Sequence, residues 1–327
     1  MKIDLTKITP TKISTDIKGR SFLLYGPPKV GKTSLSAQFP KPIILAFEKG
    51  YEALDNAYVV DMTSWSDFKT VCRQLKNKQV RDMYDTVVLD TAQIAYDLAV
   101  QFVCSNNGVT ALSDVPYGKA YKMVENEFGK SLREITQLGY GIVAIAHEKV
   151  KKADKDGNAL QVAPDLEKRC LSIINKLVDV VGYITNEYDE NEKNTRWVYT
   201  RETPAFLAGS RFTYLKPKIK LGYKELAGAL EEAILKKKEI DGAELTDKVE
   251  SREGEHRSFE EIRTNASKLW GALINRDPEN YQLIMKKIED IIGYQVKLSE
   301  LQPAQIEAFE LILQEMETIA ESQGINV

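Results

Sequence analysis

The stretch Gly26-Pro27-Pro28-Lys29-Val30-Gly31-Lys32-Thr33-Ser34 decides the fold of this chain. A strand-like apolar run, Ser21–Tyr25, comes before it, and a helix-like run, Leu35–Phe39, comes after it. The spacing is G-x-x-x-x-G-K-[ST], which forms a phosphate-binding loop when it lies between a strand and a helix. Its glycines free successive backbone N–H groups to surround an anion at a helix N-terminus. Residues 26–34 are therefore predicted to bind a nucleoside triphosphate.

The chemistry of this loop assigns roles to particular side chains. The Lys32 ammonium is expected to reach the β- and γ-phosphates, and the Thr33 hydroxyl is expected to bind Mg²⁺. Asp90 ends the apolar run Val87–Leu89, which is the Walker B pattern of a carboxylate at the end of a buried strand. Asp90 is predicted to hold the metal through water. ATP and Mg²⁺ are the predicted cofactors.

Two further side chains follow apolar runs and are candidates for catalysis. Glu48 follows Pro42–Phe47, and His147 follows Ile142–Ala146. Because ligands of open α/β sheets bind at the carboxyl ends of the strands, both side chains are expected near the phosphate loop. We predict that Glu48 activates the attacking water and that His147 senses the γ-phosphate and signals its loss to the following loop.

Strand-like and helix-like segments alternate from residue 21 to about residue 240. The strand candidates are Ser21–Tyr25, Ile43–Phe47, Thr86–Asp90, Gly141–Ala146, Val180–Asn186 and Arg196–Thr200. The helix candidates are Lys32–Phe39, Ser66–Asn77, Thr91–Val103, Tyr117–Leu138, Leu166–Leu177 and Tyr223–Lys238. Several strand candidates are apolar throughout, which is typical of strands buried on both faces of a parallel sheet. The pattern predicts an α/β fold with a twisted, mostly parallel sheet flanked by helices.

Composition divides the chain into four parts. Residues 1–18 form a mixed, basic N-terminal arm, and residues 19–240 form the α/β core. Residues 241–258 are polar and charged and are expected to be a linker. Residues 259–327 carry apolar side chains at helical spacing, and they predict a small bundle of three helices.

The net charge of −3 hides an asymmetry along the chain. Residues 225–327 carry 12 basic and 22 acidic side chains, a balance of −10, which leaves +7 for residues 1–224. A basic body with an acidic tail suggests polyanion binding with an internal competitor. A solvated surface of mixed charge is the alternative.

The remaining composition excludes several classes of protein. The three cysteines lie far apart, which argues against a disulfide framework, and two histidines are too few for a histidine-rich metal site. No apolar run approaches the ~18 residues that span a bilayer, and residues 1–12 lack the apolar segment of a signal peptide. The sequence therefore predicts a cytoplasmic protein without a membrane partner.

Four elements in chain order resemble the RecA-like recombinase core. They are the phosphate loop, Glu48, Asp90-Thr91 and Ala146-His147-Glu148-Lys149. The chain looks most like the small phage-encoded RecA-like P-loop ATPases linked to single-strand annealing, and the resemblance covers residues 16–238. The glutamate soon after the loop, rather than beside the Walker B aspartate, favours RecA-like proteins over other P-loop classes. RecA itself has glutamine where His147 stands, and histidine there is similar to the phage branch and to RadA-type proteins.

The resemblance implies two loops that face DNA. The first spans Ser105–Gly118, and the second spans Glu148–Pro164. Glycine-containing, lysine-rich loops suit sequence-independent contact with nucleic-acid phosphates. The residues expected to contact DNA are Asn106, Asn107, Lys149, Lys151, Lys152 and Lys155.

The resemblance also implies a basic residue that completes the nucleotide site of a neighbouring subunit. Arg211 lies where the phage proteins look to carry such a residue, and Arg201 and Lys216 are alternatives. A cation supplied in this way stabilises charge on the transferred phosphoryl group. The expected assembly is a homo-oligomer, a ring or a filament, with nucleotide at its subunit interfaces.

These observations together predict an ATPase, stimulated by DNA, that acts on single-stranded DNA in recombination or annealing beside a single-strand-binding protein. If the chain is phage-encoded, it works in the host cytoplasm. An AAA+-type helicase loader or replication ATPase is the first alternative, although such proteins carry a glutamate directly after the Walker B aspartate, where this chain has Thr91. A small-molecule or nucleotide kinase is the second, and it would need an arginine-bearing lid.

Overall fold

The computed structural model describes residues 6, 8–150, 161–188, 194–246 and 257–325. The chain forms two compact units: Pro10–Arg252, and Glu253–Val327 together with Met1–Thr9. The first unit holds the phosphate loop. The second is a helical bundle.

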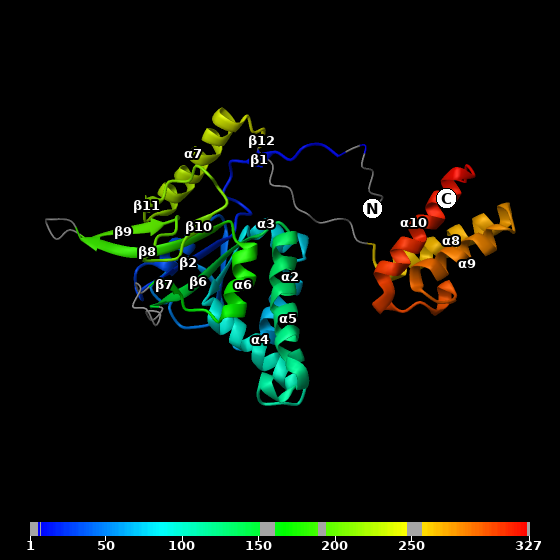
Figure 1. Cartoon of the computed structure of the whole chain (residues 1–327), viewed down its shortest axis with the longest axis horizontal. Coiled ribbons are helices and arrows are strands. Elements are labelled where there is room, and N and C mark those ends of the chain that lie inside the picture. Colours follow the sequence, from blue (N-terminus) through cyan, green and yellow to red (C-terminus); the bar gives the residue numbers. More distant parts are fainter. Residues whose placement is uncertain (1–5, 7, 151–160, 189–193, 247–256, 326–327) are drawn as a thin grey trace. The chain divides into compact units, whose positions relative to one another are not determined.

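Within the described part of the first unit, ten strands form one sheet with a parallel centre (Figure 1). The parallel strands, in spatial order, are β8 (Val180–Tyr188), β2 (Phe22–Gly26), β6 (Gly141–Val150), β5 (Thr86–Asp90), β3 (Pro42–Ala46) and β4 (Tyr58–Asp61). The antiparallel strands are β9 (Asn194–Tyr199) and β10 (Gly209–Ser210) beside β8, β11 (Lys218–Lys220) beside β9, and β7 (Val162–Pro164) beside β6. The phosphate-loop strand β2 thus lies between β8 and β6 in the interior of the sheet.

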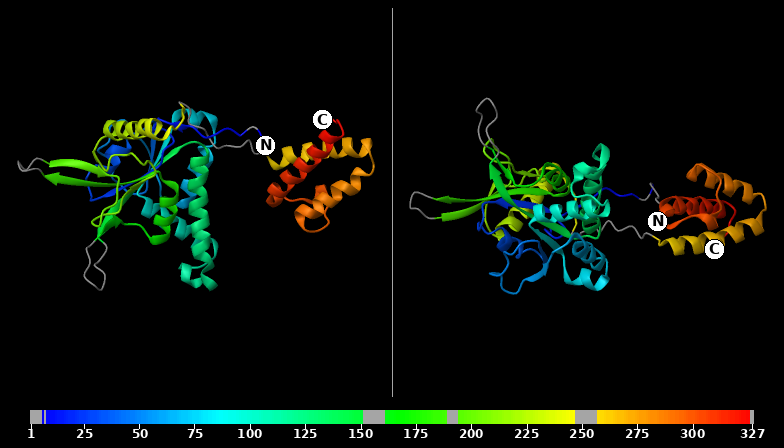
Figure 2. Two further views of the ribbon diagram at one scale, coloured as in Figure 1. Left: turned by 45° about the horizontal axis from the view of Figure 1, so that its top comes forward. Right: turned by 90° about the horizontal axis from the view of Figure 1, so that it is seen from below.

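Helices cover both faces of this sheet, as Figures 1 and 2 show. The helices of this unit are α1 (Lys32–Ser36), α2 (Trp65–Gln74), α3 (Lys78–Met83), α4 (Ala92–Asn106), α5 (Lys119–Gln137), α6 (Lys168–Leu177) and α7 (Tyr223–Asp241). Helices α2, α4, α5 and α6 pack over one face, and α1 and α7 pack over the other. This arrangement confirms the predicted α/β class with a mostly parallel sheet flanked by helices.

Strand β2 shows why its sequence is apolar throughout. Leu23 and Tyr25 enter the core beneath α2, α4, α5 and α6, while Phe22 and Leu24 enter the core beneath α1 and α7. All four side chains are fully buried. A strand buried on both faces needs apolar residues at every position, because successive side chains point to opposite faces.

Several short elements were not expected from the sequence. They are α3 and the strands β4, β7, β10 and β11, together with a parallel pair formed by β1 (Ile13–Ser14) and β12 (Leu245–Thr246). The pairing of β1 with β12 joins the expected N-terminal arm to the start of the expected linker. Such short strands carry little periodic signal, because they are defined by a pairing partner far away in the sequence.

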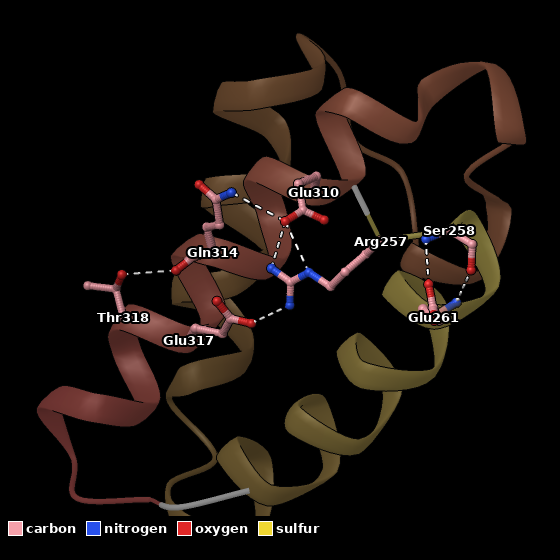
Figure 3. A network of polar contacts seen from close by, with 7 residues as sticks. All are labelled: Arg257, Ser258, Glu261, Glu310, Gln314, Glu317 and Thr318. Carbon is pink, nitrogen blue, oxygen red and sulfur yellow. Dashed lines mark hydrogen bonds and ion pairs between the residues drawn. The ribbon is translucent and has the colours of Figure 1, made fainter. Parts of the chain in front are cut away.

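In its described residues, the second unit contains the helices α8 (Phe259–Arg276), α9 (Asn280–Ile292) and α10 (Ile306–Ser322). Its apolar core includes Leu273, Ile284 and Phe309, one from each helix. Figure 3 shows hydrogen bonds between Arg257, which directly precedes the α8 N-cap, and two glutamates of α10. The Arg257 guanidinium donates to Glu310 Oε1 and, at 2.7 Å, to Glu317 Oε1. Beside it, Ser258 and Glu261 form a capping box that satisfies free N–H groups at the helix start.

None of the described helices combines the length and the hydrophobicity of a bilayer-spanning segment.

Candidate nucleotide site

The phosphate loop connects β2 to α1 and has the backbone that its sequence predicts. Gly31 has φ +104°, and Lys29 has φ +62°, both in the left-handed region. At Gly26 the chain approaches β8 so closely that a Cβ atom would lie 2.1 Å from the Ile184 carbonyl oxygen. Gly26 leaves room for β8, and Gly31 allows the last turn of the loop before Lys32.

Lys32 is 6% exposed, and its ammonium lies within the loop. It donates to the carbonyl oxygens of Gly26 at 2.9 Å and Pro27 at 2.8 Å. Burial lowers the pKa of Lys32, and the nearby carboxylates of Asp90, Glu148 and Glu48 oppose this shift. A desolvated cation in a loop of backbone donors is suited to bind an anionic ligand.

Asp90 and Thr33, the two residues expected to bind the metal ion, are in direct contact. The Thr33 hydroxyl donates to Asp90 Oδ2 at 2.7 Å, and the Asp90 side chain is buried at the carboxyl end of β5. Burial raises the pKa of Asp90, while the Thr33 hydrogen bond lowers it. A hydroxyl and a carboxylate are hard oxygen ligands of the kind that Mg²⁺ prefers, so the residues present fit this ion.

Glu48 and His147 meet at the same edge of the sheet. Glu48 follows β3, and its backbone N–H donates to the Asp90 carbonyl at 3.3 Å. His147 lies on β6 in register with Gly26, and its Nε2 is 3.2 Å from Glu48 Oε1. Asp90 interacts electrostatically with Lys32, Glu48 and His147. The structure therefore brings these four side chains together at one edge, although they come from four separate segments.

Glu148 also reaches this site, a role that its sequence context did not predict. Strand β6 continues beyond Ala146 to Val150, because Glu148 pairs with Pro164 of β7. Glu148 interacts with the Tyr183 hydroxyl, but its Oε2 is buried and has no hydrogen-bond partner among the described residues. Its position directly after His147 was the signal that could have identified it.

Arg211 lies away from the phosphate loop of its own chain. It follows β10, which pairs with the first residues of β8, at the edge of the sheet opposite the nucleotide site. Its guanidinium donates to the Lys176 carbonyl at 2.6 Å and lies 3.5 Å from Asp179 Oδ1. Within one chain, Arg211 thus binds the end of α6.

The residues expected to contact DNA divide into three groups. Asn106 and Asn107 lie at the end of α4, where the Asn107 amide donates to the Val103 carbonyl at 2.8 Å. Lys149 is paired within the chain, with Asp165 Oδ1 at 3.0 Å and the Leu166 carbonyl at 2.9 Å. The other three, Lys151, Lys152 and Lys155, lie outside the described residues.

The α4–α5 hairpin carries an exposed aromatic side chain that was not expected from the sequence. Its tip extends from the body of the first unit in Figure 1 and in the left view of Figure 2. Tyr117 at this tip is 95% exposed and has φ +59°, and Gly118 after it has φ +65°. A bulky residue in the left-handed region costs about 1–2 kcal/mol, so the backbone at this tip is strained while the aromatic ring is exposed to solvent.

Parts of this chain are similar to known proteins. A family described as "AAA domain" matches residues 18–212, more than half of the chain. The SPbeta prophage-derived uncharacterized protein YorG of Bacillus subtilis (strain 168) is 26% identical over 330 residues, which cover 98% of this chain and 99% of that protein. The KaiC-like protein PH0186 of Pyrococcus horikoshii OT3 aligns with a TM-score of 0.37 and 15% identity, over 62% of this chain and 85% of that one.

Proposed function

Since the chain belongs to the AAA-domain family of P-loop ATPases, we propose that it couples ATP hydrolysis to single-stranded DNA in recombination or annealing. The observation that carries the proposal is the 3.2 Å contact between Glu48 Oε1 and His147 Nε2. This contact links the expected catalytic carboxylate to the strand that leads into the second expected DNA loop. A change at the terminal phosphate can therefore act on that loop through His147.

The chain's own residues supply the rest of the chemistry. Backbone N–H groups of the loop and the Lys32 ammonium bind the phosphates, and Thr33 and Asp90 hold Mg²⁺. When bound, this ion neutralises charge on the phosphate oxygens. Glu48 orients the attacking water and accepts its proton, and His147 keeps the Glu48 carboxylate in place.

DNA binding is supported by charge and by the α4–α5 tip. Residues 1–224 carry a balance of +7, and sequence-independent DNA binding depends on such positive charge. Tyr117 at the tip is exposed, and an exposed aromatic ring can stack on any base. The prophage-derived relative supports the phage setting that the RecA-like resemblance implies.

Assembly is part of the same proposal. The Arg211 guanidinium lies at the edge of the sheet opposite the phosphate loop. In a head-to-tail ring or filament, this edge of one copy would face the nucleotide of the next. Arg211 is therefore proposed to complete the neighbour's site.

The loader alternative is less well supported by the geometry. It requires a catalytic glutamate on the Walker B strand, directly after Asp90. That position holds Thr91, and Glu48, which interacts electrostatically with Asp90, comes instead from β3. The placement of this carboxylate favours the RecA-like interpretation.

The test is the ATPase rate of the full chain with and without single-stranded DNA, for wild type and Glu48→Gln. We expect DNA to stimulate wild type. Glu48→Gln should still bind ATP but hydrolyse it at least ~100-fold more slowly, because a neutral amide cannot accept the proton of water.

Glu52→Gln is the matched control, since Glu52 is an exposed glutamate four residues further along the chain. It should hydrolyse ATP as wild type does. Full activity of Glu48→Gln would remove Glu48 from catalysis. An ATPase rate that is the same with and without single-stranded DNA would favour the helicase loader. Phosphoryl transfer to a small molecule would favour the kinase.

A further inference from the structure

Arg196 lies against the phosphate loop from a distant part of the chain. It is on β9, next to β8, and pairs with Asn186, two residues beyond Ile184, whose carbonyl approaches Gly26. From this position Arg196 Nη1 donates to the Val30 carbonyl at 3.3 Å. The side chain thus reaches the loop just before its last glycine.

The fit around Gly31 shows how close this approach is. A Cβ atom at Gly31 would lie 2.8 Å from Arg196 Nη1 and 3.3 Å from Leu221 Cδ2. The Leu221 backbone N–H in turn donates to the Arg196 carbonyl at 2.9 Å. Arg196 and Leu221 therefore form one support for the turn that precedes Lys32.

The strand that carries Arg196 is itself held in place by Lys218 of β11. The Lys218 ammonium is paired with Glu187 of β8 and lies 4.5 Å from the centre of the Trp197 ring, next to Arg196. The Tyr199 hydroxyl also donates to Glu187. Because these contacts join β8, β9 and β11, Arg196 projects from a fixed part of the sheet.

The guanidinium of Arg196 has bonding capacity left over. It offers five N–H donors, and within the described residues only the bond to Val30 is made and no ion pair is formed. An arginine whose charge is not neutralised by a carboxylate, next to a loop that binds phosphates, adds positive potential where the ligand is most negative.

We propose that Arg196 is a positioning residue for the nucleotide in its own chain. It holds the Val30–Gly31 turn so that the backbone N–H groups around Lys32 face the phosphates, and its charge adds to their attraction. The proposal rests on the ATPase assignment and is independent of DNA. It predicts an effect on nucleotide affinity, whereas the hydrolysis step at Glu48 is left intact.

The experiment compares wild type, Arg196→Ala and Arg196→Lys as full chains without DNA. N-methylanthraniloyl-labelled ATP is titrated by fluorescence, kcat and KM are measured, and thermal unfolding is recorded without nucleotide. We expect Arg196→Ala to raise Kd and KM about tenfold, which corresponds to about 1.4 kcal/mol. We expect kcat to change by less than about twofold and Arg196→Lys to recover part of the affinity.

Arg73→Ala is the matched control. Arg73 is an exposed arginine on α2, and the one hydrogen bond of its side chain among the described residues is to Thr70 Oγ1 at 2.9 Å. This variant should bind the labelled ATP as wild type does. The change in its unfolding temperature also shows how much stability the loss of an exposed arginine costs by itself.

Three results would overturn the proposal. The first is wild-type affinity of Arg196→Ala. The second is a loss of affinity in Arg196→Ala that Arg196→Lys does not restore, together with a larger drop in unfolding temperature than Arg73→Ala shows. That combination would mean that Arg196 only stabilises β9. The third is a wild-type chain that binds no labelled ATP, which would remove the ATPase premise itself. Loss of DNA stimulation, by contrast, would leave this inference standing.

Discussion

Asp90 has a buried carboxyl group at the carboxyl end of β5. Its side chain is 6% exposed, and burial raises its pKa. Asp90→Asn keeps an oxygen that accepts the Thr33 hydrogen bond but removes the buried charge. We expect its thermal unfolding midpoint, measured without nucleotide and Mg²⁺, to rise by a few degrees, while ATP hydrolysis is lost.

The difference in stability between Asp90→Asn and wild type should change with pH in a defined direction. Because the pKa of Asp90 is higher in the folded protein than in the unfolded chain, the folded protein takes up this proton first as the pH falls. The resulting stabilisation is complete at low pH and is lost as the pH rises through the raised pKa. The advantage of Asp90→Asn over wild type should therefore shrink as the pH falls from neutral toward about pH 4, the ordinary pKa of an aspartate. A difference that stays constant over this range would contradict the buried charge as its cause.

Tyr117 tests the DNA-binding proposal at a single side chain. Base stacking on an aromatic ring is worth about 1–3 kcal/mol, so Tyr117→Ala should weaken single-stranded DNA binding about tenfold. Tyr117→Phe should bind as wild type does, because stacking needs only the ring. Tyr188→Ala is the control, since Tyr188 at the end of β8 is also exposed, at 69%. Equal affinities of Tyr117→Ala and wild type, measured by fluorescence anisotropy, would remove Tyr117 from the DNA surface.

At the scale of elements, the helical bundle depends on the pairing of Arg257 with α10. Arg257→Ala leaves Glu310 and Glu317 without their shared cation, and all three side chains are partly buried. We expect the bundle to lose about 1–3 kcal/mol, seen by calorimetry as an earlier transition, with ATPase activity unchanged. Arg276→Ala, at the end of α8 and without an ion pair among the described residues, should leave this transition in place. If Arg257→Ala and Arg276→Ala unfold at the same temperature, the Arg257 network contributes nothing to the stability of the bundle.

The parallel pair β1–β12 shows how an element can depend on sequence far away. Ile13 and Leu245 are partners in this pair and pack on the core beneath α7. Each strand has two residues, so neither is recognisable from the order of its side chains alone. The same holds for β7, whose pairing with β6 extends that strand through Glu148, Lys149 and Val150.

At the scale of the molecule, the opposite charges of the core and the tail lead to a prediction. A chain that ends after Thr246 keeps β12 and all of α7 but removes most of the acidic tail. If that tail competes with DNA, the shortened chain should bind single-stranded DNA several-fold more tightly at low salt and with a steeper salt dependence. Unchanged affinity and slope, measured between about 50 and 200 mM salt, would exclude competition.

The sequence by itself determined the phosphate loop, the α/β class and the side chains that end the central strands. These follow from local rules: glycine spacing around an anion, apolar runs for doubly buried strands, and polar residues at strand ends. The family match agrees with the loop and the class.

Only the tertiary structure decided which distant side chains meet. It brings Arg196 to the phosphate loop, joins His147 to Glu48 and pairs Lys149 with Asp165. It also turns Tyr117 outward and pairs β1 with β12. The physical reason is that a lone charged or aromatic side chain has no sequence period, so its role depends on which strands and helices pack beside it.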